Sequence, residues 1–332
     1  MSDLWPGLNG PAIRYISEAP SEAWRRGVRQ LVLLGSTGSI GGNTLAAIRS
    51  RRRECVVLGL SCARNIKTLA EQAQEFRPPY LAVLDEASAA GLRKLLPTGY
   101  TPEILVGSEG YARLAALPEA DTVLSAQVGA AGLAGTLAAA LAGKVICLAN
   151  KESLVLAGDM LRQVCARTHA SILPVDSEHN AIFQCLAGRG QEVDRLLLTA
   201  SGGPFRGRSR EELCNVTRAQ ALDHPNWKMG AKISIDSATM MNKALEVVEA
   251  FHLYGVPLEK ITVLVHPQSL VHSLVQFTDG SQLAQLGMPD SASPSRPACS
   301  GPAAWIRACR RWIWSRPVPC SSSPPTTRPS RP

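Results

Sequence analysis

The sequence lacks the features that would place it in a membrane or among small secreted proteins held by disulfides. No uncharged apolar stretch reaches the roughly 18 residues that are needed to span a bilayer. The nine cysteines are scattered, none belongs to a C-x-x-C pair, and no signal-peptide core precedes them. We therefore expect a cytoplasmic protein with reduced thiols and no membrane partner.

A general excess of positive charge is also missing. The formal net charge is +8, but residues 291–332 contain seven arginines and no acidic residue, so the first 290 residues carry 28 basic and 27 acidic side chains. These first 290 residues show no basic element with interleaved aromatic residues of the kind that binds nucleic acid. We expect no nucleic-acid partner.

What is present fits a globular protein of more than one domain. The chain has 332 residues, 45% hydrophobic and 19% charged, which is too apolar for a disordered protein and longer than one compact core usually is. Short apolar strands alternate with helical patterns up to about residue 150, and this alternation predicts a parallel sheet covered on both faces. The expected strands are 30–34, 55–60, 81–84, 104–106, 122–125 and 145–148, with a helix at 66–76 after the second.

The pattern changes after residue 150. We expect a helix at 154–168, a strand at 171–175, a helix that opens at Asp176, and a helix capped by Ser237 that ends before Gly255. Further expected strands are 196–199, 232–235 and 261–265, followed by a hairpin of 270–277 and 282–286. The predicted fold class is α/β, with a boundary near 150–175. The predicted domains are an extension at 1–28, a Rossmann-like NADP-binding domain at 29–150 and an α+β catalytic domain at 151–290.

Residues 291–332 are predicted to be an irregular, disordered tail. They contain nine prolines, nine serines and seven arginines without helical or strand periodicity. One set of synonymous codons for residues 291–314 reads in another frame as an ordinary globular sequence. We therefore expect an out-of-frame tail after Asp290, with a genuine Pro/Ser/Arg-rich linker as the alternative. Sequencing the gene across codon 291 decides between them.

A glycine-rich turn joins the first expected strand to the first helix. Gly35, Gly38 and Gly41 permit a tight turn, and the helix N-terminus that follows offers N–H groups and a positive dipole end to a pyrophosphate. At the end of the second strand, Arg64 beside Asn65 suits the 2′-phosphate of NADP, whereas an acid there would bind the ribose of NAD. The sequence predicts NADP binding, with a turn that serves packing alone as the alternative.

Three carboxylates form a second group of interest. Asp176 and Glu178 are two apart on a segment expected to be extended, so their side chains should point the same way. Glu246, from the helix capped by Ser237, would complete an oxygen-rich site for a divalent ion that holds two substrate oxygens. Two acids that cap the positive end of a helix are the alternative reading.

Several polar residues predict a phosphate subsite and a lid. A phosphate could be held by Ser201, Gly202, Gly203, Ser237, Asn242 and Lys243. His224 and Trp227 lie in a long polar loop of the kind that forms lids. Simpler readings remain open: a surface ion pair for Lys243 and Glu246, a surface histidine for His224, and a solvated lysine for Lys151.

Six sequence blocks together resemble the 1-deoxy-D-xylulose 5-phosphate reductoisomerase family. The resemblance runs in order from about residue 29 to Asp290. Its blocks are GSTGSIG (35–41), LANKESL (148–154), PVDSEHNAIFQ (174–184), SGGPF (201–205), HPNWKMG (224–230) and DSATMMNK (236–243).

The resemblance implies a function and a set of site residues. It implies a cytoplasmic homodimer of non-mevalonate isoprenoid synthesis that uses NADPH and Mn²⁺, Mg²⁺ or Co²⁺. Such an enzyme isomerises and then reduces 1-deoxy-D-xylulose 5-phosphate to 2-C-methyl-D-erythritol 4-phosphate. By resemblance, the metal ligands are Asp176, Glu178 and Glu246, and the catalytic residues are Lys151, Glu178 and His224. The substrate contacts are Lys151, Ser177, Glu178, Ser201, His224, Ser237, Asn242, Lys243 and Glu246. The NADPH contacts are Thr37, Gly38, Ser39, Ile40, Ala63, Arg64, Asn65, Asn150, Glu152 and Gly230. Trp227 matches the aromatic residue of a closing loop.

The sequence departs from the family in two places. Ala63-Arg64 stands where Gly-Lys is common, which keeps the positive charge. After Asp290 the family continues into a C-terminal helical domain that we expect to be missing here. Two other functions stay open: an inactive truncated product that retains only an NADP-binding module, and an ordinary NADP-dependent dehydrogenase that would not need all three acids.

Overall fold

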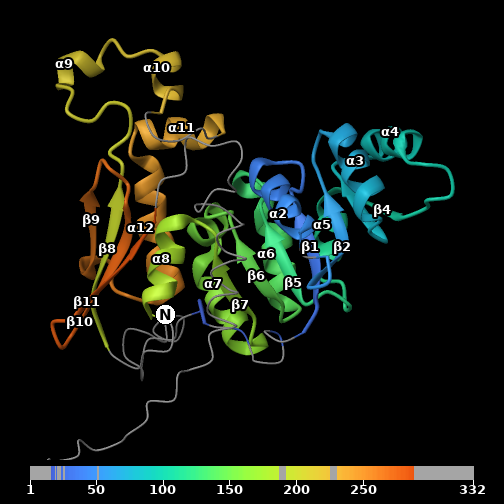
Figure 1. Cartoon of the computed structure of the whole chain (residues 1–332), viewed down its shortest axis with the longest axis horizontal. Helices are drawn as coiled ribbons and strands as arrows, with labels where there is room; N and C mark the ends of the chain where they lie inside the picture. Colours follow the sequence, from blue (N-terminus) through green and yellow to red (C-terminus); the bar gives the residue numbers. More distant parts are fainter. Residues whose placement is uncertain are drawn as a thin grey trace, which may run out of the picture.

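The fold consists of two sheets with helices between and around them (Figure 1). The computed structural model describes residues 16–18, 20, 24, 27–50, 52–186, 192–224 and 230–287. Trp227, the predicted tail at 291–332 and most of the extension at 1–28 lie outside these residues. Within them, no helix is both long and apolar enough to cross a bilayer.

The first sheet has seven parallel strands in the order β4-β3-β2-β1-β5-β6-β7. Residues of β1 alternate between two cores, because successive side chains of a strand point to opposite faces. Leu31 and Leu33 pack toward α2, α3 and α4, whereas Val32 and Leu34 pack toward α5, α6 and α7. The strands are β1 (Arg29–Leu34), β2 (Cys55–Ser61), β3 (Tyr80–Val83), β4 (Glu103–Val106), β5 (Thr122–Ser125), β6 (Val145–Leu148) and β7 (Ser171–Pro174). The helices are α2 (Ser39–Arg49), α3 (Ile66–Phe76), α4 (Glu86–Leu95), α5 (Gly107–Ala115), α6 (Gly132–Leu141) and α7 (Glu152–Thr168), with a short turn η2 (Gly129–Ala131) before α6.

The second sheet has four strands in the order β11-β10-β8-β9. These are β8 (Val193–Ala200), β9 (Ile261–Val265), β10 (Val271–Phe277) and β11 (Gln282–Leu286), and the hairpin of β10 and β11 is confirmed. Helices α8 (Ser177–Leu186) and α12 (Met241–Tyr254) pack between this sheet and the first. Buried side chains of both sheets, such as Leu34 and Leu198, belong to one continuous hydrophobic cluster.

The chain between β8 and α12 makes an excursion away from both sheets. It carries α9 (Arg210–Leu213), α10 (Arg218–Leu222) and α11 (Ala231–Ala238), while the short turn η3 (Leu258–Lys260) precedes β9. Figure 1 shows α9 and α10 standing clear of the sheets. Few of their side chains are buried, so this segment depends little on the core.

The predicted strand at 232–235 is wrong, because these residues lie in helix α11. Ile233 and Ile235 alternate with polar residues, but four residues are too few to distinguish a strand period from a helical one. Ser237 is likewise not a helix cap, since it lies inside α11. Helix α12 begins only after Met240, whose φ of 60° breaks the chain direction between the two helices.

The first sheet extends beyond residue 150. Strand β7 pairs in parallel with β6 along its whole length, from Ser171 to Pro174. The division of the chain into domains at residue 150 stays a prediction.

Candidate active site

The glycine turn after β1 brings the backbone into contacts that no larger residue would allow. Gly35 has a φ of +83°, and a Cβ there would lie 2.7 Å from Ala126 O. A Cβ on Gly41 would lie 2.5 Å from both Gly35 O and Ser36 Cα. Gly38 precedes α2 as its N-cap and makes no side-chain cap bond. The start of α2 is therefore a tight, glycine-lined cradle that fits the pyrophosphate of a dinucleotide.

Substituting Gly41 with alanine should weaken NADPH binding by about 10-fold or more, because the new Cβ must push the turn away from the helix and misplace the cradle by about 1 Å. Gly42 is the matched control, since a Cβ there meets nothing within 4 Å. Gly42→Ala should leave NADPH affinity unchanged. Fluorescence titration of both variants measures the difference, and equal affinities would show that the turn does not hold the cofactor.

The loop that follows β5 forms the other side of this crevice. Strand β1 lies between β2 and β5, so the direction of the strand order reverses here, as it does where α/β sheets bind ligands. Asn150 holds the loop, because its Nδ2 donates to Gln127 O at 2.7 Å and to Gly129 O at 2.9 Å. Val128 between them is 71% exposed. Sequence reasoning missed this loop, since finding it requires the strand order.

The residues expected at the NADP 2′-phosphate lie at the end of β2. Ala63, Arg64 and Asn65 are all exposed there. Asn65 also has a structural role, since its Oδ1 accepts a hydrogen bond from Thr68 N at 3.2 Å as the N-cap of α3. Arg64 thus places an exposed positive charge at this strand end.

Three carboxylates and two lysines meet in one buried cluster. Lys151 Nζ lies 2.5 Å from Asp176 Oδ2 and 3.3 Å from Glu246 Oε1. Lys243 Nζ lies 2.9 Å from Glu178 Oε1 and also contacts Glu246 Oε2. Glu246 therefore joins the two ion pairs. The structure brings together all three acids that the sequence singled out, with two ammonium groups between them.

The local geometry of the first two acids differs from the sequence expectation. Asp176 follows β7 and Glu178 lies in the first turn of α8, so they do not share an extended segment. The helix begins at Ser177, next to the expected start at Asp176, and Asn180 N–H donates to Asp176 O at 2.8 Å in its first turn. Glu178 consequently sits at the positive end of a helix, where a carboxylate is stabilised.

Burial and charge shift the pKa of each group in opposite directions. Lys151 and Lys243 are 6% and 5% exposed, and burial alone would lower the pKa of each ammonium. The adjacent carboxylates outweigh burial and raise both lysine pKa values. Burial opposes ionisation of Glu178, but Lys243 and the Ser177 hydroxyl lower its pKa to about 2. For Asp176 burial prevails over Lys151 and raises the pKa.

Three of the simpler readings are wrong. Lys151 is buried in the cluster rather than solvated, and the ion pair of Lys243 and Glu246 is buried rather than at the surface. His224 is also buried, and burial lowers the pKa of its imidazole.

The donor set fits a divalent cation, although lysines lie among the carboxylates. Within the described residues, no three Asp, Glu, His or Cys side chains surround a common point as a metal site would require. The carboxylates of Asp176 after β7, Glu178 of α8 and Glu246 of α12 nevertheless supply the oxygen donors that Mg²⁺ and Mn²⁺ prefer. They exceed the two ammonium groups by one negative charge. A cation that entered the cluster would therefore compete with Lys151 and Lys243 for the same oxygens.

A second polar group lies at the end of β8. Ser201 Oγ is 3.1 Å from His224 Nε2, and a Cβ on Gly203 would lie only 2.6 Å from Ser237 O. Arg206 donates to Ser201 O at 2.6 Å. Ser201, His224 and the α11 backbone at Ser237 are thus brought together as expected. In contrast, Asn242 and Lys243 direct their polar atoms into the carboxylate cluster.

A chain of contacts connects the two halves of the site. Asn150 Nδ2 donates to Glu152 Oε2 at 3.1 Å, and Lys232 Nζ lies 2.7 Å from both Glu152 Oε1 and Asp236 Oδ2. The residue between Asn150 and Glu152 is Lys151 of the cluster. The glycine cradle, the loop after β5, the cluster and α11 are thus adjacent, while Gly230 is the N-cap of α11.

Comparison with known proteins decides the family. Residues 31–158 match the family described as 1-deoxy-D-xylulose 5-phosphate reductoisomerase, and residues 172–254 match its C-terminal domain. The 1-deoxy-D-xylulose 5-phosphate reductoisomerase of Nitratidesulfovibrio vulgaris (strain DP4) is 63% identical over 280 residues, which cover 84% of this chain and 69% of that protein. The chain belongs to the 1-deoxy-D-xylulose 5-phosphate reductoisomerase family.

Solved reductoisomerase structures share the fold. A crystal structure of DOX-P reductoisomerase in complex with NADPH, fosmidomycin and magnesium aligns with a TM-score of 0.76 and 47% identity, over 79% of this chain and 67% of that one. The reductoisomerase of Zymomonas mobilis in complex with NADPH aligns with a TM-score of 0.74 and 43% identity, over 84% and 75% respectively. The expected mixed α/β class with a parallel sheet is confirmed.

Five of the six reductoisomerase sequence blocks lie wholly in the described residues, and the block at 224–230 lies there in part. The blocks at 35–41, 148–154, 174–184, 201–205 and 236–243 supply the cradle, the cluster and the serine group. Of the block at 224–230, the structure describes only His224 and Gly230. Family blocks far apart in sequence thus meet around one cluster.

Proposed function

We propose that this chain converts 1-deoxy-D-xylulose 5-phosphate to 2-C-methyl-D-erythritol 4-phosphate with NADPH and a divalent metal ion, by isomerisation and then reduction. The observation that carries the proposal is the buried cluster of Asp176, Glu178 and Glu246 beside a glycine cradle. Membership of the reductoisomerase family and the NADPH and magnesium in a 47% identical relative support the same chemistry.

The carboxylates are proposed to hold the metal ion. Asp176 lies in the short link between β7 and α8, and Glu178 is two residues further on in α8, whereas Glu246 is brought beside them by the packing of α12. When bound, the ion would polarise substrate oxygens and stabilise negative charge on them. We propose Mn²⁺, Mg²⁺ or Co²⁺, because all accept oxygen donors.

We propose that the Lys151 ammonium contacts the substrate oxygen whose bonding changes during the isomerisation. Asn242 Oδ1 accepts a hydrogen bond from Lys151 Nζ at 2.8 Å and so helps to orient the ammonium. The raised pKa of Lys151 keeps this group protonated at neutral pH. It can therefore donate a hydrogen bond to a substrate oxygen. His224, held near Ser201, would contact the substrate beside it.

The remaining predicted residues would position the substrate and the cofactor. Ser201 and Ser237 are proposed to bind the phosphate, remote from the bonds that change. Ser177, Asn242 and Lys243, which contact the carboxylate cluster, are proposed to bind the carbon chain and the phosphate beside it. We propose that the 2′-phosphate of NADPH lies near Arg64. The other proposed cofactor contacts are Thr37, Gly38, Ser39, Ile40, Ala63, Asn65, Asn150, Glu152 and Gly230.

An assay of the purified chain separates the competing functions. We expect oxidation of NADPH, followed at 340 nm, when the sugar phosphate and Mn²⁺ are both present. NADPH binding without turnover would favour an inactive product that retains only the cofactor module. Turnover that persists after chelation of the metal would favour an ordinary dehydrogenase. Each outcome is read from the same preparation.

We also propose a cytoplasmic homodimer that serves isoprenoid synthesis. Edge strand β9 carries exposed apolar side chains at Val263, Leu264 and Val265, the last of them 53% exposed. An unpaired apolar edge of this kind favours contact with a second chain.

Val265→Lys should therefore raise the dimer dissociation constant by about 10-fold or more, since a buried unpaired charge costs several kcal/mol. Leu141→Lys, at a similarly exposed position at the end of α6, is the matched control and should change nothing. Light scattering over a dilution series gives the dissociation constants. Equal values for the two variants would remove β9 from the interface.

A further inference from the structure

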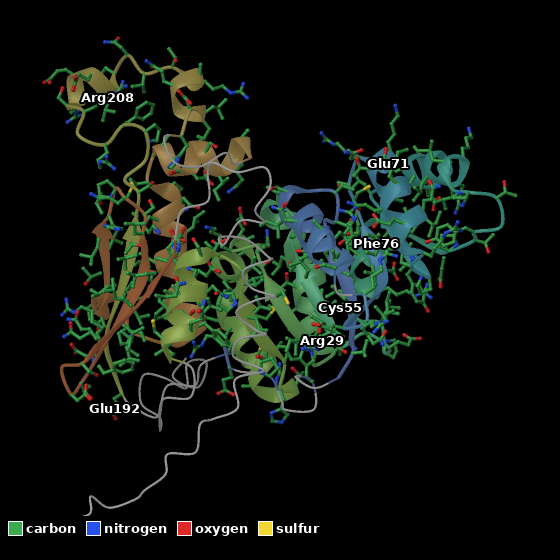
Figure 2. The ribbon with its side chains drawn as sticks, viewed as in Figure 1. Arg29, Cys55, Glu71, Phe76, Glu192 and Arg208 are labelled. Atoms are coloured by element: carbon green, nitrogen blue, oxygen red, sulfur yellow. The ribbon has the colours of Figure 1, made fainter. Side chains whose placement is uncertain are left out.

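Residues near the N-terminus cross the end of the seven-stranded sheet that lies opposite the cofactor crevice. Trp24 Nε1 donates to Thr122 Oγ1 at 2.8 Å, at the first residue of β5. Ser171 Oγ, at the first residue of β7, donates to Glu18 O at 2.6 Å. The paired residues Arg29 and Cys55 lie at this same end of the sheet, at the starts of β1 and β2 (Figure 2). We name residues 16–18 and 24 the N-terminal strap.

Ile16 of the strap joins two elements through its backbone. Its carbonyl accepts from Ile172 N of β7 at 2.9 Å, and its N–H donates to Leu253 O of α12 at 3.1 Å. Strand β7 is an edge strand, and the N–H of Ile172 points away from its neighbour β6. The Ile16 carbonyl therefore gives this N–H a hydrogen-bond partner. The Ile16 side chain, 7% exposed, belongs to the core that both sheets share.

The elements in contact with the strap are those that carry the three acids. Strand β7 leads directly to Asp176. Leu253 follows Glu246 by seven residues on α12, about 10 Å along the helix axis. Tyr254, next to Leu253, donates its hydroxyl to His179 O of α8, which is adjacent to Glu178. Ser17 is buried beside the Tyr254 hydroxyl.

We propose that Ile16, Ser17 and Glu18 are positioning residues for the carboxylate cluster. They fix the C-terminal end of α12 against β7, so that Glu246 keeps its separation from Asp176. Arg162 supports the same end of α12, since its guanidinium donates to His252 O at 2.6 Å. The strap and Arg162 therefore both hold the C-terminal end of α12. The proposal rests on the proposed function, because it treats the cluster as the metal site.

Deletion of residues 1–18 from the full chain tests the proposal, with deletion of residues 1–10 as the control that keeps the strap. The longer deletion should weaken Mn²⁺ binding, measured by electron paramagnetic resonance, by about 10-fold, the scale expected when support of metal ligands is lost. NADPH affinity should not change, because its cradle follows the C-terminal end of β1, whereas the strap contacts the N-terminal ends of β5 and β7. Amide exchange in the second half of α12 should become faster.

Other results would overturn the proposal. Unchanged Mn²⁺ affinity would show that the strap does not position the carboxylate cluster. An equal loss of NADPH and Mn²⁺ affinity would show that the strap stabilises the whole fold instead. If the parent chain binds no Mn²⁺, the proposed function fails, and unchanged amide exchange in α12 then rejects the strap as well. If the deletion variant does not fold, the same measurements are made on Ile16→Ala, which removes only side-chain packing.

Discussion

Replacing Glu246 with glutamine should lower turnover by about 10²–10³-fold, the scale expected when a group that stabilises developing charge is removed. Glu246 is the carboxylate that both lysines share, and it is 1% exposed. Glutamine keeps the shape and a hydrogen-bond acceptor but loses the charge. Mn²⁺ affinity should fall by more than about 100-fold, because a ligand is lost rather than its support.

The unfolding of Glu246→Gln should also change. Without the shared carboxylate, Lys151 keeps its ion pair with Asp176 and Lys243 keeps its ion pair with Glu178, and breaking a buried ion pair costs about 3–5 kcal/mol. The added neutral amide still accepts from one lysine, so we expect a loss near the lower end of this range in metal-free denaturation. Asn242 Nδ2, which now donates to Glu246 Oε1 at 2.6 Å, can donate to the amide oxygen as well.

Glu71→Gln is the matched control. Glu71 lies exposed on α3, far from α12 in Figure 2, so this substitution removes the same charge at a distance. Its turnover, Mn²⁺ affinity and unfolding should match those of the parent chain. If Glu246→Gln behaved like Glu71→Gln in Mn²⁺ binding, the cluster would be a structural ion network and not the metal site.

The strands of the first sheet can be predicted closely from the sequence because each is marked by a short run of neighbouring residues. Strands buried on both faces must be continuous apolar runs, and the runs at 122–125 and 145–148 begin and end where β5 and β6 do. Part of the glycine turn is equally local, since a Cβ on Gly41 would meet Gly35 and Ser36, whereas the close contact of Gly35 is with Ala126 of a distant strand end. What could not be predicted is the loop at Val128, which becomes part of the crevice only through strand order.

The second half was harder because its elements are specified by tertiary contacts. Helix α11 has one buried residue, Ser234, so its sequence carries little periodic signal, and the alternation of Ile233 and Ile235 wrongly predicts a strand. The three acids were identified from residue type and family resemblance, but their arrangement depends on Lys151 and Lys243. A lysine can be assigned to a buried cluster only when its carboxylate partners are placed around it, because burial without them is unfavourable.

Lys151→Met should separate metal affinity from turnover. The Lys151 ammonium, 2.5 Å from Asp176 Oδ2, neutralises oxygens that a metal ion would need. Methionine has a similar length and no charge, so the competing cation is removed and Mn²⁺ should bind about 10-fold more tightly, the equivalent of roughly 1.4 kcal/mol. Turnover should nevertheless fall by about 10²-fold or more, because a protonated group at the reacting oxygen is lost.

The same substitution should make folding depend on the metal. In the metal-free chain, the buried carboxylates of Asp176 and Glu246 would lose their ion pairs with Lys151, which should destabilise the fold by about 3–5 kcal/mol. Mn²⁺ binds the folded state only, so it should raise the melting temperature of Lys151→Met more than that of the parent chain. Lys94→Met on the exposed surface of α4 is the control and should show the parent's response. Weaker Mn²⁺ binding by Lys151→Met would mean that the ammonium supports the metal ligands instead of competing for them, and the lysines would then hold the three carboxylates in place for the ion.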